Sequence, residues 1–280
     1  MLKIGAQDIT GLYVGETKIE KAYLGEELVY SAGVTKEYQD YEYFSVDTSA
    51  VVGNYSPYAQ LIIKPRVSVN GKSTAYTFYF KASIPTNTLS SGSMYSYFVY
   101  SPSKLIASGK YAQYILRAYV STSQKLSMSY AANSGTSSTL GSGYSGSISG
   151  TGFLNIPTIY KFIFNSAGLQ YDMYAGDTLV RAGATSGYSY PFSNLTSSNS
   201  FTLNIMGDGS KATSSTGARI FRGKLHAFAV FSPAVTFDDS MWFIPCKKTS
   251  TGELGFRNGD STQFLKIHNS QYIITGPKVN

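Results

Sequence analysis

Cysteine, histidine and tryptophan are nearly absent from this chain: its 280 residues include one Cys, two His and one Trp. Cys246 therefore has no partner for a disulfide within the chain, and these counts exclude a Cys/His metal centre. Hydrophobic runs are short, and none approaches the ~20 residues that a membrane-spanning helix needs. Residues 1–8 contain no apolar stretch of the kind found in a secretion signal. We expect neither membrane insertion nor export by that route.

Charged residues are also scarce, at 14% of the chain against about 25% in an average soluble domain. Residues 48–171 contain nine Lys or Arg and no Asp or Glu. Glycoside hydrolysis usually needs a pair of carboxylates, so this gap disfavours a depolymerase. Asp40 and Glu42 could share a strand face, but a solvated edge strand explains them better. The sequence therefore indicates a protein that is not an enzyme.

The net charge is nevertheless +7, from 23 Lys and Arg against 16 Asp and Glu. The basic residues are spread along the chain, and the longest run is Lys247-Lys248. Nucleic-acid-binding proteins cluster such residues on a face or arm, so no nucleic-acid partner is expected. Diffuse positive charge instead favours an anionic polymer on a cell surface.

Three isolated residues, His226, Cys246 and Asp208, carry groups that could take part in chemistry. His226 lies in a strand-like pattern, and no Gly-x-Ser-x-Gly motif accompanies it. The two lysines after Cys246 could lower the pKa of its thiol, although a buried structural cysteine is more common. Asp208, in a Gly-Asp-Gly turn, could offer a carboxylate to calcium, or could bond its own backbone. No cofactor is required by the sequence, and calcium is left open with Asp208 as its ligand.

What the chain has in abundance is β-forming sequence: 24 Tyr and 16 Phe, with many Thr, Val and Ile. Residues 74–81 and 159–164 alternate apolar and polar side chains, as a half-buried strand does. Residues 169–180 predict a hairpin that turns at Ala175-Gly176-Asp177. No segment shows a helical period over three turns. These patterns predict an all-β protein built as a sandwich or jelly roll.

Three units are expected along the chain: a small β module at 1–32, a β-sandwich at 33–245 and a C-terminal β extension at 246–280. Residues 1–32 are too few to bury a core alone, so the module must dock on the sandwich or on a partner. Two Ser/Gly/Thr-rich stretches, 133–152 and 183–200, read as long loops, which are often functional or disordered.

Two strings of residues carry a resemblance to a known class of proteins. Residues 21–30, Lys-Ala-Tyr-Leu-Gly-Glu-Glu-Leu-Val-Tyr, resemble the opening module of bacteriophage and prophage structural proteins. Pro245-Cys246, then residues 252–256 and Gly276-Pro277, resemble the end of phage-encoded concanavalin A-like (laminin G-like) domains. In that family a Tyr-Asp pair stands where this chain has Arg257-Asn258, which puts the detail of that turn in doubt.

The resemblance implies a tail- or fibre-associated virion protein with a concanavalin A-like jelly-roll sandwich, located on the virion. It implies attachment to other virion proteins through 1–32 and contact with a host-surface glycan through the sandwich. The alternative is a purely structural connector or decoration protein without a glycan ligand, and a homo-oligomer is compatible with either. Because aromatic faces stack on sugars and amides bond their hydroxyls, the candidate ligand-binding residues are Tyr144, Tyr188, Tyr190, Asn194 and Asn199.

Overall fold

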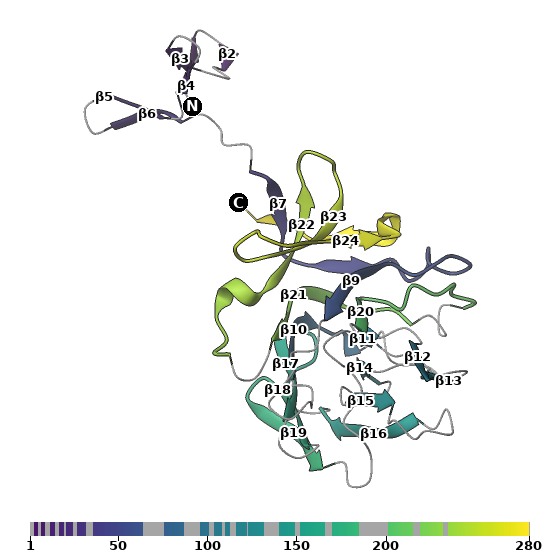
Figure 1. Cartoon of the computed structure of the whole chain (residues 1–280). Coiled ribbons are helices and arrows are strands. Elements are labelled where there is room, and N and C mark those ends of the chain that lie inside the picture. Colours follow the sequence, from purple (N-terminus) through teal and green to yellow (C-terminus); the bar gives the residue numbers. More distant parts are fainter. Residues whose placement is uncertain are drawn as a thin grey trace.

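The computed structural model describes most of the chain. The described residues are 3–4, 7–8, 12–14, 17–19, 21–24, 27–31, 36–63, 76–86, 96–100, 104–107, 110–112, 116–121, 123–131, 140–148, 152–165, 170–184, 201–214, 219–231 and 235–279. Within them the protein is almost entirely β-structure (Figure 1). Turns and bends connect the strands, and the helices named among these residues are two single-turn 3-10 helices, η2 (Asp239–Met241) and η3 (Ser270–Tyr272).

One layer of the molecule is an antiparallel sheet that we call sheet D. Five of its strands follow one another in the order β19, β18, β17, β10 and β21, and β21 then pairs with both β8 and β22. The strands β7, β23, β25 and β26 extend it. Their bounds are β7 (Tyr38–Tyr41), β8 (Phe44–Val46), β10 (Thr77–Ser83), β17 (Thr158–Asn165), β18 (Gln170–Ala175), β19 (Thr178–Ala184), β21 (Lys224–Phe231), β22 (Phe243–Lys248), β23 (Leu254–Asn258), β25 (Ile273–Thr275) and β26 (Lys278–Val279).

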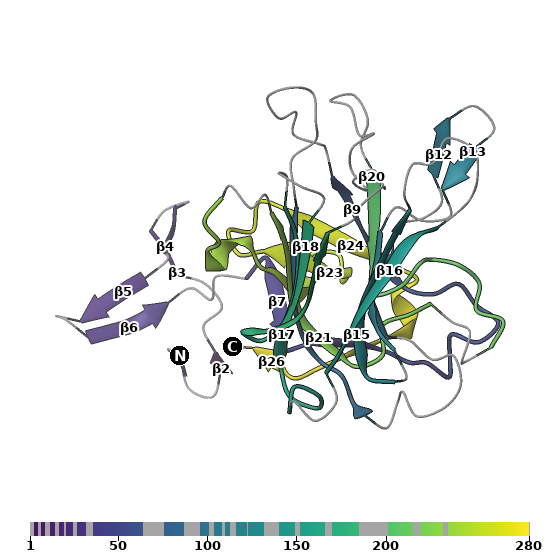
Figure 2. The ribbon, with the colours of Figure 1, turned by 90° about the horizontal axis from the view of Figure 1, so that it is seen from below.

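The facing layer, sheet G, has the order β9, β20, β11, β14, β15, β16. Strand β24 pairs with β23 of sheet D and with β9 of sheet G, so it joins the two layers at one edge. Figure 2 shows the layers face to face. The bounds are β9 (Tyr58–Ile63), β11 (Ser96–Tyr100), β14 (Leu116–Val120), β15 (Lys125–Ala131), β16 (Leu140–Ser147), β20 (Phe201–Ile205) and β24 (Phe264–His268).

Four further hairpins complete the described strands. Residues 1–32 contribute three of them, and none of their strands pairs with sheet D or sheet G in the described part of the chain. The string 21–30 forms the hairpin of β5 and β6, with Leu24 opposite Glu27. The hairpins are β1 (Lys3–Ile4) with β2 (Gln7–Asp8), β3 (Leu12–Val14) with β4 (Thr17–Ile19), β5 (Lys21–Leu24) with β6 (Glu27–Ser31), and β12 (Lys104–Ala107) with β13 (Lys110–Ala112).

The core between the layers is built largely from phenylalanine. Phe98 of sheet G stacks on Phe80 of sheet D with ring centroids 5.0 Å apart, and also contacts Phe162 and Phe221. Phe228 continues the cluster toward Phe243 and Phe256. Alternation along each strand places these rings inward, because successive side chains of a strand point to opposite faces. Part of the aromatic abundance of the sequence therefore fills this core.

Most of the expected strands are confirmed, including the hairpin over 169–180, where Ala175 pairs with Thr178. The expectation of one long loop over 133–152 is wrong, because residues 140–147 form β16. Small residues serve packing there: a Cβ on Gly146 would lie 2.4 Å from the carbonyl oxygen of Val180. The expected boundary at 245/246 falls inside β22, and the C-terminal strands pair within both sheets.

Membrane-spanning helices were looked for in the described residues. None of the helices there is long and apolar enough to cross a membrane.

Candidate functional site

A small group of tyrosines lies on the outer face of sheet G, away from the main core, and two of them, Tyr97 and Tyr100, are buried at 5% exposure each. Asn204 stands between Leu203 and Ile205, both core residues, so alternation puts it on the opposite face. Tyr100 is the direct strand partner of Asn204 and shares that face. Tyr97 contacts Tyr100 and Tyr119 at ring centroid distances of 6.0 and 5.3 Å. We call Tyr97, Tyr100, Tyr119 and Asn204 the tyrosine face.

The turn after β20 forms the edge of the tyrosine face. Met206 adopts a left-handed backbone with φ 72°, which reverses the chain. The backbone N–H of Asp208 donates to the carbonyl of Arg219 at 3.1 Å, and Ser56 donates its N–H to the carbonyl of Ser210 at 2.9 Å. The turn is therefore held between two segments that are distant in sequence.

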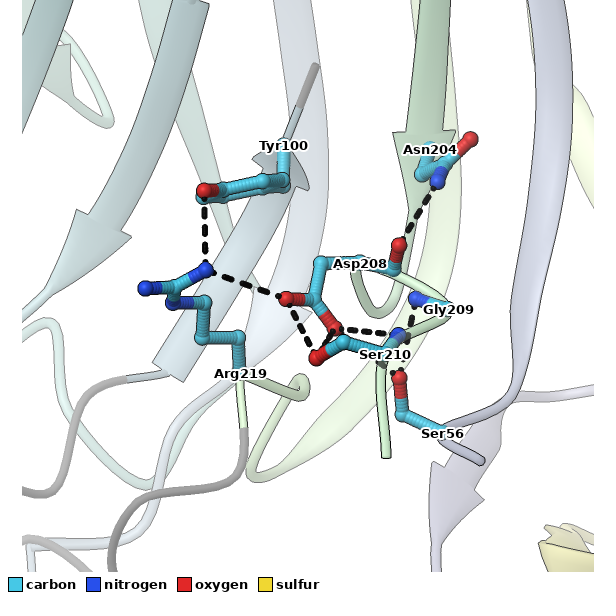
Figure 3. Close-up of polar contacts among 7 residues, drawn as sticks. All are labelled: Ser56, Tyr100, Asn204, Asp208, Gly209, Ser210 and Arg219. Carbon is cyan, nitrogen blue, oxygen red and sulfur yellow. Dashed lines mark hydrogen bonds and ion pairs between the residues drawn. The ribbon is translucent and has the colours of Figure 1, made fainter. Parts of the chain in front are cut away.

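The Asp208 carboxylate organises this turn (Figure 3). Its Oδ1 accepts hydrogen bonds from the Ser56 hydroxyl at 3.1 Å and from the Ser210 backbone N–H and hydroxyl at 2.9 and 2.7 Å. Arg219 Nη1 lies 3.5 Å from Oδ2. The side chain of Asp208 is 3% exposed, so it acts inside the turn rather than at the surface.

The surroundings of Asp208 do not fit a calcium ion. Calcium takes six to eight oxygen ligands, whereas hydroxyl, amide and guanidinium donors from Ser56, Ser210 and Arg219 already occupy the carboxylate. Within the described residues there is no group of three His, Cys, Asp or Glu side chains that could hold a metal. The geometry favours the alternative of a turn aspartate, and the calcium role of Asp208 stays a prediction.

Arg219 and Asn204 are the polar side chains next to Tyr100, and of the two only Arg219 is exposed. The guanidinium of Arg219 lies 5.2 Å from the Tyr100 ring centroid and donates to the Tyr100 hydroxyl at 3.0 Å. Asn204 is 4% exposed, and its Nδ2 donates to the Asp208 carbonyl at 3.0 Å. Its Oδ1 is buried and has no hydrogen-bond partner among the described residues. Such an atom costs about 1–3 kcal/mol if no donor satisfies it, and therefore calls for an explanation.

The ligand-binding residues expected from the sequence are placed only in part. Tyr144 lies in β16 opposite Met128, so it is a strand residue and not part of a loop. Tyr188, Tyr190, Asn194 and Asn199 lie outside the described residues, and their role stays a prediction.

Sequence reasoning missed the tyrosine face because it looked for aromatics in loops. A polar Asn inside the apolar strand Phe-Thr-Leu-Asn-Ile was the available signal.

Asp40, which could pair with Glu42 on the sequence pattern, is engaged by an arginine instead. Asp40 accepts two hydrogen bonds from Arg257, at 2.8 Å to Nε and 2.6 Å to Nη2. It lies in β7, which has a neighbour on each side, so it is not on a solvated edge. Cys246 is buried, and burial together with the charge of Asp40 raises the pKa of its thiol to about 12. The two following lysines do not activate it.

Sheet D carries a serine–histidine contact that the sequence did not indicate. His226 Nε2 lies 2.9 Å from the Ser83 hydroxyl, and Nδ1 lies 3.0 Å from the backbone carbonyl of Glu42. Because a carbonyl accepts only, we assign the proton to Nδ1, and Ser83 then donates to Nε2. Ser83 is 7% exposed, so its hydroxyl is largely shielded from solvent. The contact ties β10 and β21 to the bend after β7.

His226 should make stability depend on pH. Desolvation lowers its pKa, as do the nearby Lys81 and Lys224, while the hydrogen bond to Glu42 opposes this shift. The unfolded chain, with a His pKa near ~6.5, then binds the proton more readily than the folded protein. Stability should be complete above about pH 7 and fall as the pH drops through ~6.5 toward the folded pKa. Melting temperatures between pH 8 and 5 measure this.

The variant His226→Gln should flatten the melting profile between pH 7.5 and 5.5, because the titrating group is gone. His268→Gln is the matched control, since His268 is exposed and stacks on Tyr58 at 4.8 Å. It should keep the slope of the unmodified protein. An unchanged slope in His226→Gln would show that another group causes the pH dependence.

No protein-family model matches the chain, and no curated protein matches it. Solved structures share its arrangement of strands at a distance. A heptameric pentraxin from Limulus polyphemus is 12% identical with a TM-score of 0.40, over 69% of this chain and 77% of that one. Sheep galectin-11 is 12% identical with a TM-score of 0.33, over 60% and 98%. The CBM40 of the Ruminococcus gnavus IT-sialidase, bound to α2,3-sialyllactose, is 11% identical with a TM-score of 0.39, over 65% and 96%.

At these identities the likeness concerns the fold alone. The strand pairing by itself gives two facing antiparallel sheets joined at β24. The prediction of an all-β fold is confirmed: the described part of the chain is an antiparallel β-sandwich.

Proposed function

We propose that this chain is a non-enzymatic adhesion protein that binds a saccharide on the tyrosine face. The observation that carries the proposal is the buried Oδ1 of Asn204, which has no hydrogen-bond partner among the described residues and belongs to the direct strand partner of Tyr100. A sugar offers hydroxyl donors and apolar C–H faces together, and these match an amide oxygen beside tyrosine rings. Gln60, the exposed strand partner of Asn204, lies next to it on the same face of the sheet.

We further propose that the protein belongs to a phage tail or fibre and is located on the virion. The support is the resemblance of residues 21–30 to phage structural proteins, a string that here forms the hairpin of β5 and β6. Residues 1–32 carry three Lys and five acidic residues, a charge of −2, while the rest of the chain is +9. A module of opposite charge whose strands pair with neither sheet, among those described, suits attachment to other virion proteins.

The scarcity of available carboxylates supports binding without cleavage. The strands β9, β11, β14, β15, β16 and β20 contain no Asp or Glu. Asp208 is enclosed in its turn, and Asp40 is bound to Arg257. A glycosidase would need an acid and a second carboxylate on either side of the bound sugar, and the tyrosine face offers neither.

A glycan array probed with the whole chain tests the saccharide proposal. We expect Asn204→Ala to weaken binding about tenfold, which corresponds to about 1.4 kcal/mol, because the acceptor is lost. Gln60→Ala, at an exposed site on the same face, should also change affinity without affecting folding. Gln271→Ala is the matched control, because Gln271 is exposed beside sheet D. Thermal melts of each variant separate lost binding from lost structure.

Two results would overturn the proposal. Absence of binding to any glycan, combined with tight association to purified virion proteins, would favour the structural connector. Release of reducing sugar from host envelopes would show an enzyme. The virion assignment is tested separately by mass spectrometry of purified phage particles, in which the chain should be present.

A further inference from the structure

We infer that the tyrosine face takes an acidic saccharide, whose carboxylate or phosphate group binds the free edge of the Arg219 guanidinium. The inference rests on the proposed function, since it names the class of sugar that the same face would bind. It begins from the arrangement of Arg219, Tyr100 and Asp208 in Figure 3.

Arg219 is fixed at one nitrogen and open at the others. Its Nη1 donates to the Tyr100 hydroxyl at 3.0 Å and lies 3.5 Å from Asp208 Oδ2. In Figure 3 the second terminal nitrogen points away from both partners. Within the described residues no hydrogen bond engages Nε or Nη2, and the side chain is 49% exposed. A guanidinium held in this way presents its planar fork to a ligand without having to be ordered first.

Asp208 engages only one of the hydrogen-bond donors of Arg219, and at a long distance. Its carboxylate accepts stronger hydrogen bonds from Ser56 and Ser210, at 2.7–3.1 Å, and touches Arg219 through a single contact of 3.5 Å. Arg257 provides the comparison within the same protein, because its pair with Asp40 is bidentate with distances of 2.8 and 2.6 Å. The guanidinium of Arg257 is thus engaged by protein acceptors on both edges, whereas that of Arg219 keeps one edge available to a ligand.

The charge around the tyrosine face favours an anion. Six strands of sheet G contain two basic residues, Arg117 and Lys125, and no acidic residue. They are β9, β20, β11, β14, β15 and β16. Arg222, 3% exposed and close enough to Tyr97 to interact with it electrostatically, adds a second guanidinium near the tyrosines. Charge-assisted bidentate bonds from arginine to carboxylate or phosphate are stronger than bonds between neutral groups. The oxyanion would therefore supply affinity, and Tyr100 with Asn204 would contact the sugar ring.

The test measures the affinity of the full chain for four matched probes: oligogalacturonate, its methyl ester, neutral oligogalactose and an oligomer of glycerol phosphate. Calorimetry at low and physiological salt is run on the unmodified protein, Arg219→Gln and Arg219→Lys. Arg181→Gln is the control, because Arg181 is exposed on sheet D. We expect Arg219→Gln to lower the affinity for an acidic probe at least tenfold and Arg219→Lys to lower it less. Neutral probes should be unaffected, and salt should weaken acidic binding.

The outcomes separate this inference from the function on which it rests. Equal affinity of Arg219→Gln and unmodified protein for acidic probes would overturn the inference, while neutral-glycan binding sensitive to Asn204→Ala would leave the proposed function standing. Failure of every saccharide to bind, here and on the array, would overturn both. A response to the phosphate oligomer alone, lost in Arg219→Gln, would support the inference and identify phosphate as the oxyanion.

Discussion

Replacing Phe98 with Ala is expected to lower the free energy of unfolding by about 3–5 kcal/mol. Phe98 is 0% exposed and sits where the two sheets meet. Its ring centroid lies 5.0 Å from that of Phe80, 5.1 Å from Tyr160 and 5.5 Å from Phe221. The substitution removes the apolar area that Phe98 buries and leaves a cavity that surrounding rings, fixed in two sheets, cannot fill.

Urea denaturation followed by far-UV circular dichroism measures this change. Ile62→Ala is the control, since Ile62 is 57% exposed on β9. This substitution should lower the free energy of unfolding by less than about 0.5 kcal/mol. If Phe98→Ala unfolded at the same urea concentration as Ile62→Ala, the two sheets would not share one core.

Replacing Asp40 with Ala should lower the free energy of unfolding by about 2–3 kcal/mol, less than a fully buried pair because both side chains are partly solvated. Arg257 joins β23 to β7 through Asp40, and its Nη1 also donates to the carbonyl of Gly259 and the hydroxyl of Ser261. Without Asp40, the guanidinium keeps its charge but loses its two shortest bonds, so the attachment of the C-terminal strands weakens.

In a protein that keeps Asp40, the variant Arg257→Lys should retain little of the stability that the Asp40–Arg257 pair provides. An ammonium group cannot donate to both carboxylate oxygens in the same plane. Asp177→Ala is the matched control: Asp177 pairs with Lys161 at 2.9 Å but is fully exposed, so its removal should leave the urea midpoint unchanged. Equal effects of Asp40→Ala and Asp177→Ala would show that the Asp40–Arg257 pair contributes no more than a surface ion pair.

Local sequence patterns predicted the strands well where alternation was strong. The hairpin around Gly176 was readable because a turn signal separates two alternating segments. Residues 140–147 were misread as loop, because Gly and Ser have low strand propensity and nothing local reports that Gly146 must let β19 approach. Packing against another strand decided that segment.

The candidate site depended almost wholly on long-range contacts. Ser56 and Asp208 meet across 152 residues, and Ser83 and His226 across 143. Local spacing in the sequence does not reveal such pairs. The sequence therefore suggested a calcium ligand at Asp208 and no role for His226. Local patterns gave no sign of Tyr100 and Arg219 either, which contact each other at the edge of the tyrosine face.

The sequence by itself determined that the protein is β-structured and cannot form a disulfide within the chain. It also determined that charged residues are few and that their net charge is positive. These properties follow from composition and from a two-residue period, both of which are local. Only the tertiary structure decided which tyrosines share an outer face, which carboxylates are already bound and which arginine keeps a free edge. Those outcomes depend on the register between strands that are distant in the chain, and register is fixed by the packing of the whole sandwich.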